Sequence, residues 1–468
     1  MRHTGIERVQ DSVHGLMEFE GMETSVVEVL RAEELQRLRR IRQTGLAHLV
    51  YPGAEHSRLV HSLGAAHIAI RFARRLQEAT RTFLAPFLRP KQEAVRDIAL
   101  AALCHDLGHG PLSHVWESEV IGQEFDQVKW AKTLGLSGEE GLPRKWQWHE
   151  MVGQALLAWP EGQLNRLLER AEEGTSTRIR KLLLKEYYLP YLPRLLSSDI
   201  DCDRCDFILR DAHQSGVSHG RYDLKWLIST STVGRTANDQ LVVGFDKRKA
   251  PSISEQFLTA RRALYETVYY HKTVRSAQGM VGLLLKRLKE VTKEKGWFLS
   301  DQSFFSPFQK AIEGSPMEPR EILQLDDYGL WGLIQHLTTK ANVDVTIADL
   351  AKRIVGRDLF KIVPCEKQEK LRQFMENAEN HLRMQDVVGK FCPGDPKYYI
   401  HVDHATFKMF CTDSAETSYF VDFAGRDRMA EPIRDHSLFR AYPLQTEETV
   451  RLFVPRETVD QIRVMIEP

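Results

Sequence analysis

An adjacent histidine and aspartate, His105 and Asp106, close an apolar stretch of the sequence and could together carry out chemistry. Apolar side chains recur before them at helical spacing, from Val95 through Ile98 to Ala102, and the same spacing reaches both polar residues. Both side chains are therefore expected to face the protein core. A buried carboxylate and imidazole are costly unless they are paired or bind a metal. The pattern predicts a metal site, or else a hydrogen-bonded His–Asp pair with no further role.

Two more polar residues are expected to face inward from other helices. His61 lies in the first turns of a helix predicted to begin near His56. Asp203 stands three residues after Ile200 and four before Phe207, on the apolar side of its own predicted helix. An aspartate paired with a core arginine would also account for Asp203.

These four residues make up a mixed set of nitrogen and oxygen ligands: His61, His105, Asp106 and Asp203. Two imidazoles and two carboxylates suit Mn, Fe, Zn or Mg better than a metal that prefers thiolates. Such a set can leave coordination positions open for water and for a phosphate oxygen, which is typical of hydrolytic rather than structural sites. We therefore expect a divalent metal ion as cofactor.

Length, charge and cysteine content narrow the class of protein. The 468 residues are enough for more than one core. Since 64 basic residues balance 64 acidic ones, no overall field favours nucleic acid or an anionic membrane, and a site for a polyanion must be a local pocket. Six cysteines in a chain of this length do not make a disulfide scaffold.

The apolar run before the His–Asp pair is far shorter than the roughly 20 residues of a membrane span. The first residues begin no apolar signal segment. We therefore expect a cytoplasmic protein with no membrane partner.

Helical patterns dominate the chain as far as about residue 385, and strand-like runs follow. Residues 398–402 and 450–454 are rich in β-branched and aromatic side chains and come after a turn rich in Pro and Gly. We therefore predict a mainly α fold, with a helical core over residues 1–385 and a smaller C-terminal α/β lobe over residues 386–468.

Four arginines stand between the apolar positions of a helix predicted from Glu23 onward: Arg37, Arg39, Arg40 and Arg42. Such a run is usually a solvated face. It could also bind phosphate or another subunit, because the planar guanidinium fits phosphate with two parallel hydrogen bonds.

The order of the ligand set, a histidine, an adjacent His–Asp pair and a distant aspartate, resembles the metal signature of HD-domain phosphohydrolases. Residues 52–64 and 105–114 resemble in detail the deoxynucleoside triphosphate (dNTP) triphosphohydrolase branch of that family. The resemblance extends over about residues 7–115 and returns at 197–211 and 261–272. It implies an HD-domain helical core, metal ligation by the set above, and hydrolysis of a dNTP to a deoxynucleoside and inorganic triphosphate.

The resemblance also assigns residues to the substrate. It implies that four cationic side chains bind the phosphates: Arg58, Arg204, Arg261 and Lys272. Gln43 would contact the sugar, and Tyr269 would pack against the deoxyribose, where a ribose 2′-hydroxyl would collide. The cations would act by positioning and by neutralising charge.

A further group is implied to line the reacting phosphate: His109, His114 and His149. Glu117 is expected to orient His114 through an i,i+3 contact on one helix. His114 is then the candidate general acid that gives a proton to the departing 5′ oxygen.

The resemblance implies a homo-oligomer as well, a dimer-based tetramer with nucleotide at its subunit contacts and a possible allosteric nucleotide activator. The chain departs from the pattern at Arg204, where the branch has Lys, and at Phe207, where it has Tyr. In members activated by guanine nucleotides an acid near the position of Arg31 reads the base, and Arg31 cannot take that part.

Two other functions fit parts of the pattern. The same metal site could serve a nucleotidase or phosphodiesterase acting on other nucleotides, although four cations exceed what one phosphate requires. The chain could instead be a sensor that binds nucleotides or, weakly, single-stranded nucleic acid through residues 37–42. Its balanced charge disfavours the second of these ligands.

Overall fold

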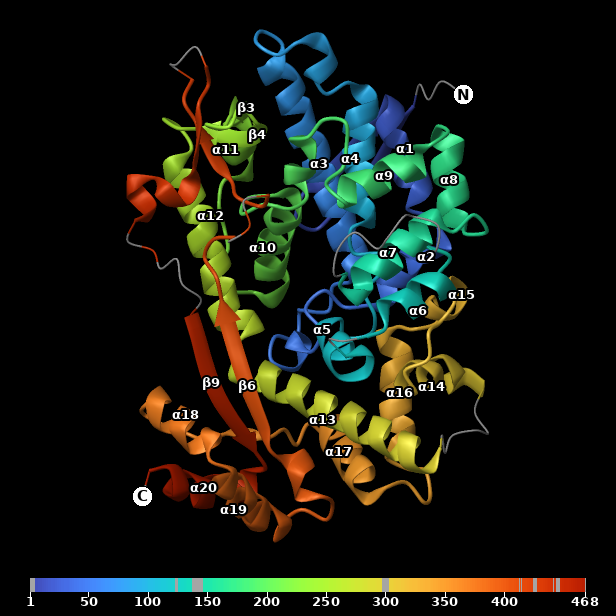
Figure 1. Ribbon diagram of the computed structural model, residues 1–468, viewed down its shortest axis with the longest axis vertical. Helices are drawn as coiled ribbons and strands as arrows, with labels where there is room; N and C mark the ends of the chain where they lie inside the picture. Colours follow the sequence, from blue (N-terminus) through green and yellow to red (C-terminus); the bar gives the residue numbers. More distant parts are fainter. Residues whose placement is uncertain are drawn as a thin grey trace.

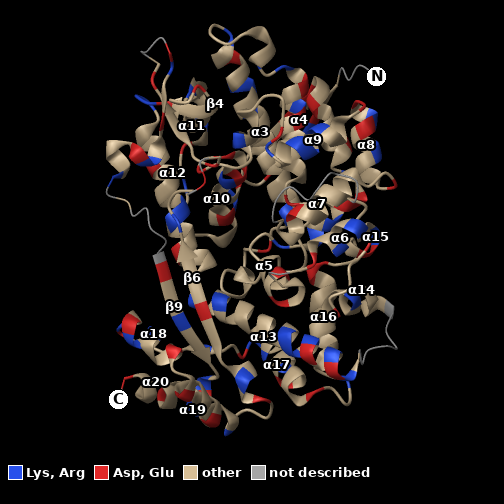
Figure 2. Cartoon of the chain, in the orientation of Figure 1, with Lys and Arg blue, Asp and Glu red and all other residues tan. Residues whose placement is uncertain are grey.

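The structure, a computed structural model, describes residues 5–122, 125–136, 146–296, 303–411, 413, 415–423, 427–440, 442 and 447–467. Helices make up most of it (Figure 1), and the described strands form three small sheets. The predicted mainly α fold class is confirmed. Lys and Arg residues are intermixed with Asp and Glu in the view of Figure 2, as the balanced composition leads one to expect.

The α-helices follow one another through the whole chain. In order they are α1 (Thr24–Val29), α2 (Glu33–Gln36), α3 (Arg58–Thr80), α4 (Gln92–Cys104), α5 (His114–Trp116), α6 (Gln127–Thr133), α7 (Trp148–Ala158), α8 (Gln163–Ala171), α9 (Thr175–Leu183), α10 (Cys202–Ser215), α11 (Leu224–Ser229), α12 (Pro251–Leu264), α13 (Lys272–Lys295), α14 (Ser306–Ile312), α15 (Pro319–Ile322), α16 (Asp327–Leu337), α17 (Val345–Val355), α18 (Gln368–Glu376), α19 (Ala378–Gly389) and α20 (Val459–Ile466). Three other segments matter for the site: the 3-10 helix η2 (Arg37–Arg40) and the π-helices η5 (Glu117–Ile121) and η7 (Tyr265–Tyr269).

The strands are β1 (Ile6–Asp11), β2 (Gly15–Glu20), β3 (Ser231–Arg235), β4 (Leu241–Asp246), β5 (Lys361–Ile362), β6 (His401–Phe407), β7 (Tyr419–Val421), β8 (Ala430–Pro432) and β9 (Glu447–Val454). β1 and β2 form a hairpin, and the other sheets have the orders β3-β4-β7-β8 and β5-β9-β6. β7 joins β4 in parallel, with Phe245 opposite Phe420, whereas β5 and β6 flank β9 antiparallel. Both larger sheets combine strands from either side of residue 385, and the division of the chain at that residue stays a prediction.

The centre of the helical core is formed by α3, α4 and α10. Both α3 and α4 have buried alanines at helical spacing, and these small side chains let the two helices lie close together. α10 also packs against α3, at Gly64, where a Cβ would lie 1.9 Å from Oδ1 of Asp206. Each of the three helices carries a predicted metal ligand at or next to one end.

The segment predicted as one helix from Glu23 is interrupted. It consists of α1, α2 and η2, and Ala32 between the first two has an extended backbone with φ −61° and ψ 138°. Among the described residues, every helix is too short or too polar to cross a bilayer.

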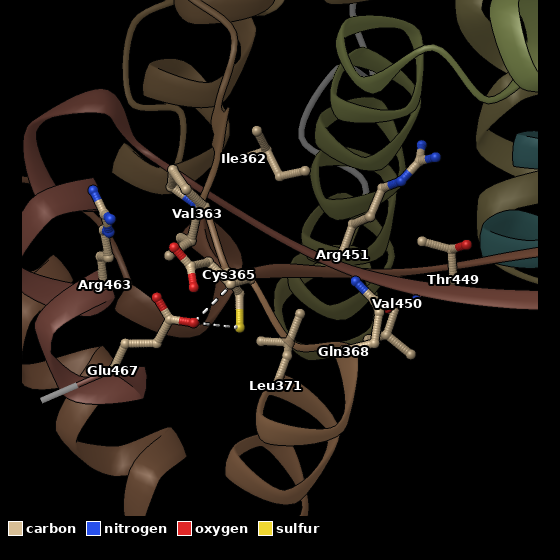
Figure 3. A pocket seen from close by; sticks show the side chains of 12 residues that line it. Ile362, Val363, Cys365, Gln368, Leu371, Thr449, Val450, Arg451, Arg463 and Glu467 are labelled. Atoms are coloured by element: carbon tan, nitrogen blue, oxygen red, sulfur yellow. Dashed lines mark hydrogen bonds between the residues drawn. The ribbon is translucent and has the colours of Figure 1, made fainter.

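A cavity of about 400 Å³ lies between β5, β9, α18 and α20 (Figure 3). Its lining is largely apolar, with Leu371 and Val450 buried beneath it and Arg463 and Glu467 at α20. None of the residues that line it belongs to the predicted site, so the chemistry has to be sought elsewhere in the fold.

Candidate metal centre and active site

Three of the four predicted ligands converge from three helices. Oδ1 of Asp203 lies 3.0 Å from Nε2 of His61 and 3.5 Å from Nε2 of His105. Asp106 adjoins them, with Oδ1 3.4 Å from Nε2 of His105 and Oδ2 3.8 Å from Nε2 of His61. Ligand atoms about 2.1 Å from a common ion lie about 3 Å or slightly more apart, so these separations are those of a metal site. His61, His105 and Asp203 can hold one ion between them.

The hydrogen bonds of the two imidazoles support the same interpretation. Nδ1 of His61 lies 2.8 Å from Oδ2 of Asp206, and Nδ1 of His105 lies 2.7 Å from the carbonyl oxygen of Ala102. Each Nδ1 therefore donates, and in the neutral ring each Nε2 presents a lone pair toward Asp203. Two electron-rich atoms so close need a proton or a cation between them. The donor set thus fits a divalent ion.

The pKa of His61 shows how strongly this place attracts positive charge. Burial alone disfavours the charged ring, but hydrogen bonds to Asp203 and Asp206 raise the pKa of His61 to about 10. Burial also opposes the charge on His105, and Asp106 and Asp203 outweigh it, so that pKa is raised too. The negative charge that raises these pKa values would also attract a divalent cation.

Asp206 orients His61 and was not predicted from the sequence. Its buried carboxylate bonds to Nδ1 of His61, to Nε2 of His14 at 2.6 Å and to the guanidinium of Arg210 at 2.8 and 3.0 Å. Gly64 leaves room for it, as described above. A signal was present, since Asp206 stands one helical turn from both Asp203 and Arg210, and a buried carboxylate at that spacing needs partners.

A second cluster consists of His109, Glu117 and His149. Nδ1 of His149 donates to Oε1 of Glu117 at 2.7 Å, and the same oxygen accepts from the backbone N–H of His149 at 3.1 Å. The rings of His109 and His149 stack with centroids 4.2 Å apart and planes 15° from parallel. The contact expected between Glu117 and His114 is not among the hydrogen bonds and ion pairs of the described residues, because Glu117, which opens the π-helix η5, is directed to His149 instead.

The second cluster is a poor metal cage despite its ligand types. His109, Glu117 and His149 have ligand atoms within 4.8 Å of one another. An imidazole binds a metal in the plane of its ring, however, and two rings stacked almost parallel cannot both direct lone pairs at one ion. Burial and the nearby Arg58 hold the pKa of His109 well below its usual range, so this ring is neutral. The cluster suits proton transfer or contact with an anion.

Asp106 joins the two clusters, since its Oδ1 lies 3.3 Å from Nε2 of His109, and Arg58 binds the other oxygen of this carboxylate. The guanidinium of Arg58, 6% exposed, donates to Oδ2 of Asp106 at 2.5 Å and to Oγ of Ser113 at 3.0 Å. Burial would raise the pKa of Asp106, but Arg58 beside it holds that pKa well below the usual range. Just before His114, Leu112 and Ser113 have backbone φ angles of 49° and 47°, which are unusual for residues other than Gly. The turn so formed sets His114 near His109, with ring centroids 5.9 Å apart.

Comparison with known proteins agrees with this geometry. Residues 58–155, which include His61, His105, Asp106 and His149, match the family model of the HD domain. The chain contains an HD domain. It is 28% identical over 382 residues to YwfO of Bacillus subtilis, which is 81% of this chain and 75% of that protein. It is 28% identical over 272 residues to the bovine deoxynucleoside triphosphate triphosphohydrolase SAMHD1, covering 56% of this chain and 44% of that one.

A solved structure resembles the whole chain. The crystal structure of a phosphohydrolase from Bacteroides thetaiotaomicron superposes with a TM-score of 0.71 over 97% of this chain and 100% of that one, at 22% sequence identity. The likeness shows that the two proteins share the fold. The prediction of an HD domain is therefore confirmed for residues 58–155, and the chain is similar to proteins named deoxynucleoside triphosphate triphosphohydrolases.

Tyr269, which is predicted to contact the deoxyribose, is linked to the predicted metal site through Phe207. Phe207 contacts the ring of His61, with centroids 6.5 Å apart, and the ring of Tyr269, at 6.3 Å. The hydroxyl of Tyr269 donates to Asp211, which also bonds to Nε2 of His56 at 2.7 Å. Phe207 therefore lies between Tyr269 and the predicted metal ligand His61, and the role of Tyr269 in substrate binding stays a prediction.

The other predicted substrate residues differ in environment. Oε1 of Gln43 is buried and has no hydrogen-bond partner among the described residues, which suits a ligand contact. Lys272 opens α13 and is exposed, three residues after Tyr269. Arg204 forms an ion pair with Asp201, and Arg261 bonds to backbone carbonyls of residues 408 and 409.

Arg37 corrects the interpretation of the arginine-rich segment as a solvated or ligand-contact face. It is fully buried and donates to the carbonyl oxygens of Leu325 at 2.9 Å and of Leu107 and His109 at 2.8 Å. Arg40 pairs with Asp326 near the start of α16. Arg37 stabilises the loop that follows the His–Asp pair, and the alternation of Arg with apolar residues could not reveal that.

Proposed function

We propose that this protein is a metal-dependent dNTP triphosphohydrolase that cleaves a dNTP to a deoxynucleoside and inorganic triphosphate. The observation that carries the proposal is the convergence of His61 and His105 on Asp203, whose Oδ1 lies 3.0 and 3.5 Å from their Nε2 atoms, beside Arg58. The similarity to proteins named dNTP triphosphohydrolases supports the choice of substrate.

The ligand set would hold the ion through His61, His105, Asp106 and Asp203. A bound divalent cation supplies positive charge that lowers the pKa of water and stabilises charge on the phosphate. Arg58 would orient the reacting phosphate, since it is fixed by Asp106 and Ser113 and retains further donors. A pre-oriented cation costs little reorganisation during reaction, which is the usual basis of phosphoryl-transfer catalysis.

The departing 5′ oxygen needs a proton, and two histidines can donate one. His114 lies at the start of α5, where desolvation by the surrounding side chains and the charge of Arg58 lower its pKa. His149 is held by the carboxylate of Glu117, which fixes the orientation of its ring. The carboxylate contact favours His149 as the donor, with His109 stacked on it and His114 beside the reacting phosphate.

The remaining assignments complete the substrate site. Arg204, Arg261 and Lys272 would bind the polyphosphate, with Gln43 and Tyr269 on the sugar. Mn, Fe, Zn or Mg would serve as the ion. The homo-oligomer, a nucleotide activator and a cytoplasmic location belong to the same proposal.

Product analysis tests it. Purified protein is incubated with each dNTP and each rNTP, singly and mixed, with Mn²⁺ or Mg²⁺, and products are separated by ion exchange. A deoxynucleoside with intact triphosphate is the expected result, and activity only in mixtures would add an activator site. Monophosphate as product would favour a nucleotidase or phosphodiesterase. No turnover under any condition would leave the sensor as the better description.

A further inference from the structure

Residues 408–411 and 415–418, which we call the clasp, follow β6 and precede β7. They pass beside α10 and α12 (Figure 1), and so bring the C-terminal part of the chain to the predicted substrate site. The clasp has no metal ligand or catalytic residue of its own. Its contacts, however, are concentrated on the predicted phosphate ligands and on the loop before Asp203.

Two of the arginines predicted to bind phosphate, Arg204 and Arg261, contact the clasp with their guanidinium groups. Nη1 and Nη2 of Arg261 donate to the carbonyl oxygens of Met409 and Lys408 at 3.2 and 3.4 Å. Nη2 of Arg204 lies 3.9 Å from Sγ of Cys411. The orientation of the Arg261 guanidinium therefore depends on where the clasp lies. Arg204 is held mainly by its ion pair with Asp201, and the clasp bounds its second Nη.

The Nε–H group of Arg261 indicates that the guanidinium is oriented for a ligand. The side chain is 8% exposed, and its Nε has no hydrogen-bond partner among the described residues. The rings of Tyr265 and Phe407 each lie 5.7 Å from the guanidinium carbon and hold its plane. A buried N–H without a partner is costly unless a ligand accepts from it.

Asp199 attaches the clasp to the loop that leads into α10. Its carboxylate, 2% exposed, accepts from the backbone N–H groups of Cys411 at 2.5 Å and Ser418 at 2.9 Å. Its own N–H donates to the carbonyl oxygen of Glu416 at 3.0 Å. Four residues later the same chain provides Asp203, so one carboxylate links the clasp and the metal centre.

We propose that Asp199 is a positioning residue that holds the clasp and thereby orients Arg204 and Arg261 to receive a polyphosphate. The proposal rests on the proposed function in naming a triphosphate as the ligand. Two backbone N–H groups of the clasp donate charge-assisted hydrogen bonds to one buried carboxylate, and this fixes the clasp backbone. Arginines held in advance of binding lose less freedom when the anion arrives, which raises affinity without a new contact to the ligand.

The test compares Asp199→Ala and Asp199→Asn with the wild type. The full-length, metal-loaded protein is used, with metal content, KM and kcat for dNTP, and the Kd of inorganic triphosphate measured by calorimetry. Asp199→Ala should raise KM and Kd by about tenfold or more, because misplaced binding groups cost that much, with metal content unchanged and kcat within about twofold. Asp199→Asn keeps one acceptor oxygen, so its KM and Kd should lie between those of the wild type and those of Asp199→Ala.

Two further variants keep the test decisive. Glu448→Gln removes an exposed contact to His404 in the same lobe, 3.0 Å long, and should leave every value unchanged. Glu416→Gln weakens the bonds of the clasp to Lys185 at 2.8 Å and Ser197 at 2.9 Å. It should raise Kd by about threefold, and it replaces Asp199→Ala if that variant does not fold.

The outcomes separate this proposal from the function. If the wild type releases triphosphate and the clasp variants keep its KM and Kd, the clasp proposal is overturned and the function stands. If no dNTP is hydrolysed but the variants bind inorganic triphosphate more weakly, the function fails and the clasp proposal stands. Loss of metal or of kcat in the variants, with Kd unchanged, would give Asp199 a different role and overturn the proposal.

Discussion

At the scale of single residues, Asp206 determines which nitrogen of His61 faces the metal site. Because its carboxylate accepts a hydrogen bond from Nδ1–H of His61, Nε2 is the nitrogen left for a cation. The same carboxylate bonds to His14 and Arg210, so it also ties the ligand to the β1–β2 hairpin. A carboxylate behind a ligating histidine raises the basicity of the ring and fixes its direction.

We predict that Asp206→Asn lowers metal affinity by about 10- to 100-fold, as removal of such a partner typically does. Arg210 retains Asp11, at 2.9 Å, as a second carboxylate, so the variant should remain folded. Equilibrium dialysis against Mn²⁺ with metal analysis measures the effect. Asp223→Asn, which changes an exposed cap of α11, is the control. Equal affinity in both variants would show that Asp206 has only a packing role.

The pairing of Glu117 with His149 gives a second prediction at this scale. If Glu117 acts through His149, Glu117→Gln should lower kcat by about tenfold or more, both in the otherwise wild-type protein and in a His114→Ala variant. In a His149→Ala background it should have almost no further effect, since a residue that acts through another loses its influence with it. Equal effects of Glu117→Gln in both backgrounds would contradict this arrangement.

At the scale of elements, η2 contributes Arg37, which bonds to the loop that follows the predicted metal ligands His105 and Asp106. Its guanidinium is held by three carbonyl oxygens and has no carboxylate bonded to it among the described residues, and burial lowers its pKa to about 10. Two of those carbonyls, of Leu107 and His109, belong to the loop after the His–Asp pair. The 3-10 turn is therefore part of what positions His109.

Replacing Arg37 tests that role. Arg37→Met should lower the free energy of unfolding by about 3 kcal/mol or more, because three buried carbonyls lose their donor at about 1–3 kcal/mol each, partly relieved by relaxation. kcat should fall as well, since the loop carrying His109 loses its support. Arg39→Met is the matched control, because Arg39 is exposed and bonds only to Gln36 among the hydrogen bonds described for it. Denaturant titration and turnover of both variants measure the difference.

The helices that could be predicted from the sequence are those whose apolar residues recur at regular helical spacing. Helices with a continuous apolar face, such as α3, α4 and α10, could be located from the sequence, and so could His61, His105 and Asp203 at their ends. The interruptions between α1 and η2 could not, because propensity there is overridden by the burial of Arg37. His149 lies 32 residues from Glu117, and a spacing rule confined to one helix pairs Glu117 with His114 instead.

At the scale of the whole molecule, the predicted C-terminal lobe is connected to the predicted substrate site by more than the clasp. Arg451 on β9 donates to the carbonyl oxygen of Tyr270, and the hydroxyl of Tyr270 donates to the carbonyl oxygen of Thr406 on β6. Arg451 also lines the cavity of Figure 3. Contacts between residues so distant in sequence have no local signal, and for that reason the sequence indicated a lobe without its connections.

These connections lead to a prediction about the boundary at residue 385. A fragment of residues 1–385 would deprive β4 of β7 and β5 of β9, and would expose surface that Phe420 and Leu452, both fully buried, now cover. Open strand edges beside uncovered apolar surface favour aggregation. We therefore expect the fragment to elute as aggregates and to unfold without the single transition of the full chain, as size-exclusion chromatography and thermal unfolding would show. A monodisperse fragment that melts cooperatively and binds metal as the full chain does would instead make residue 385 a true folding boundary.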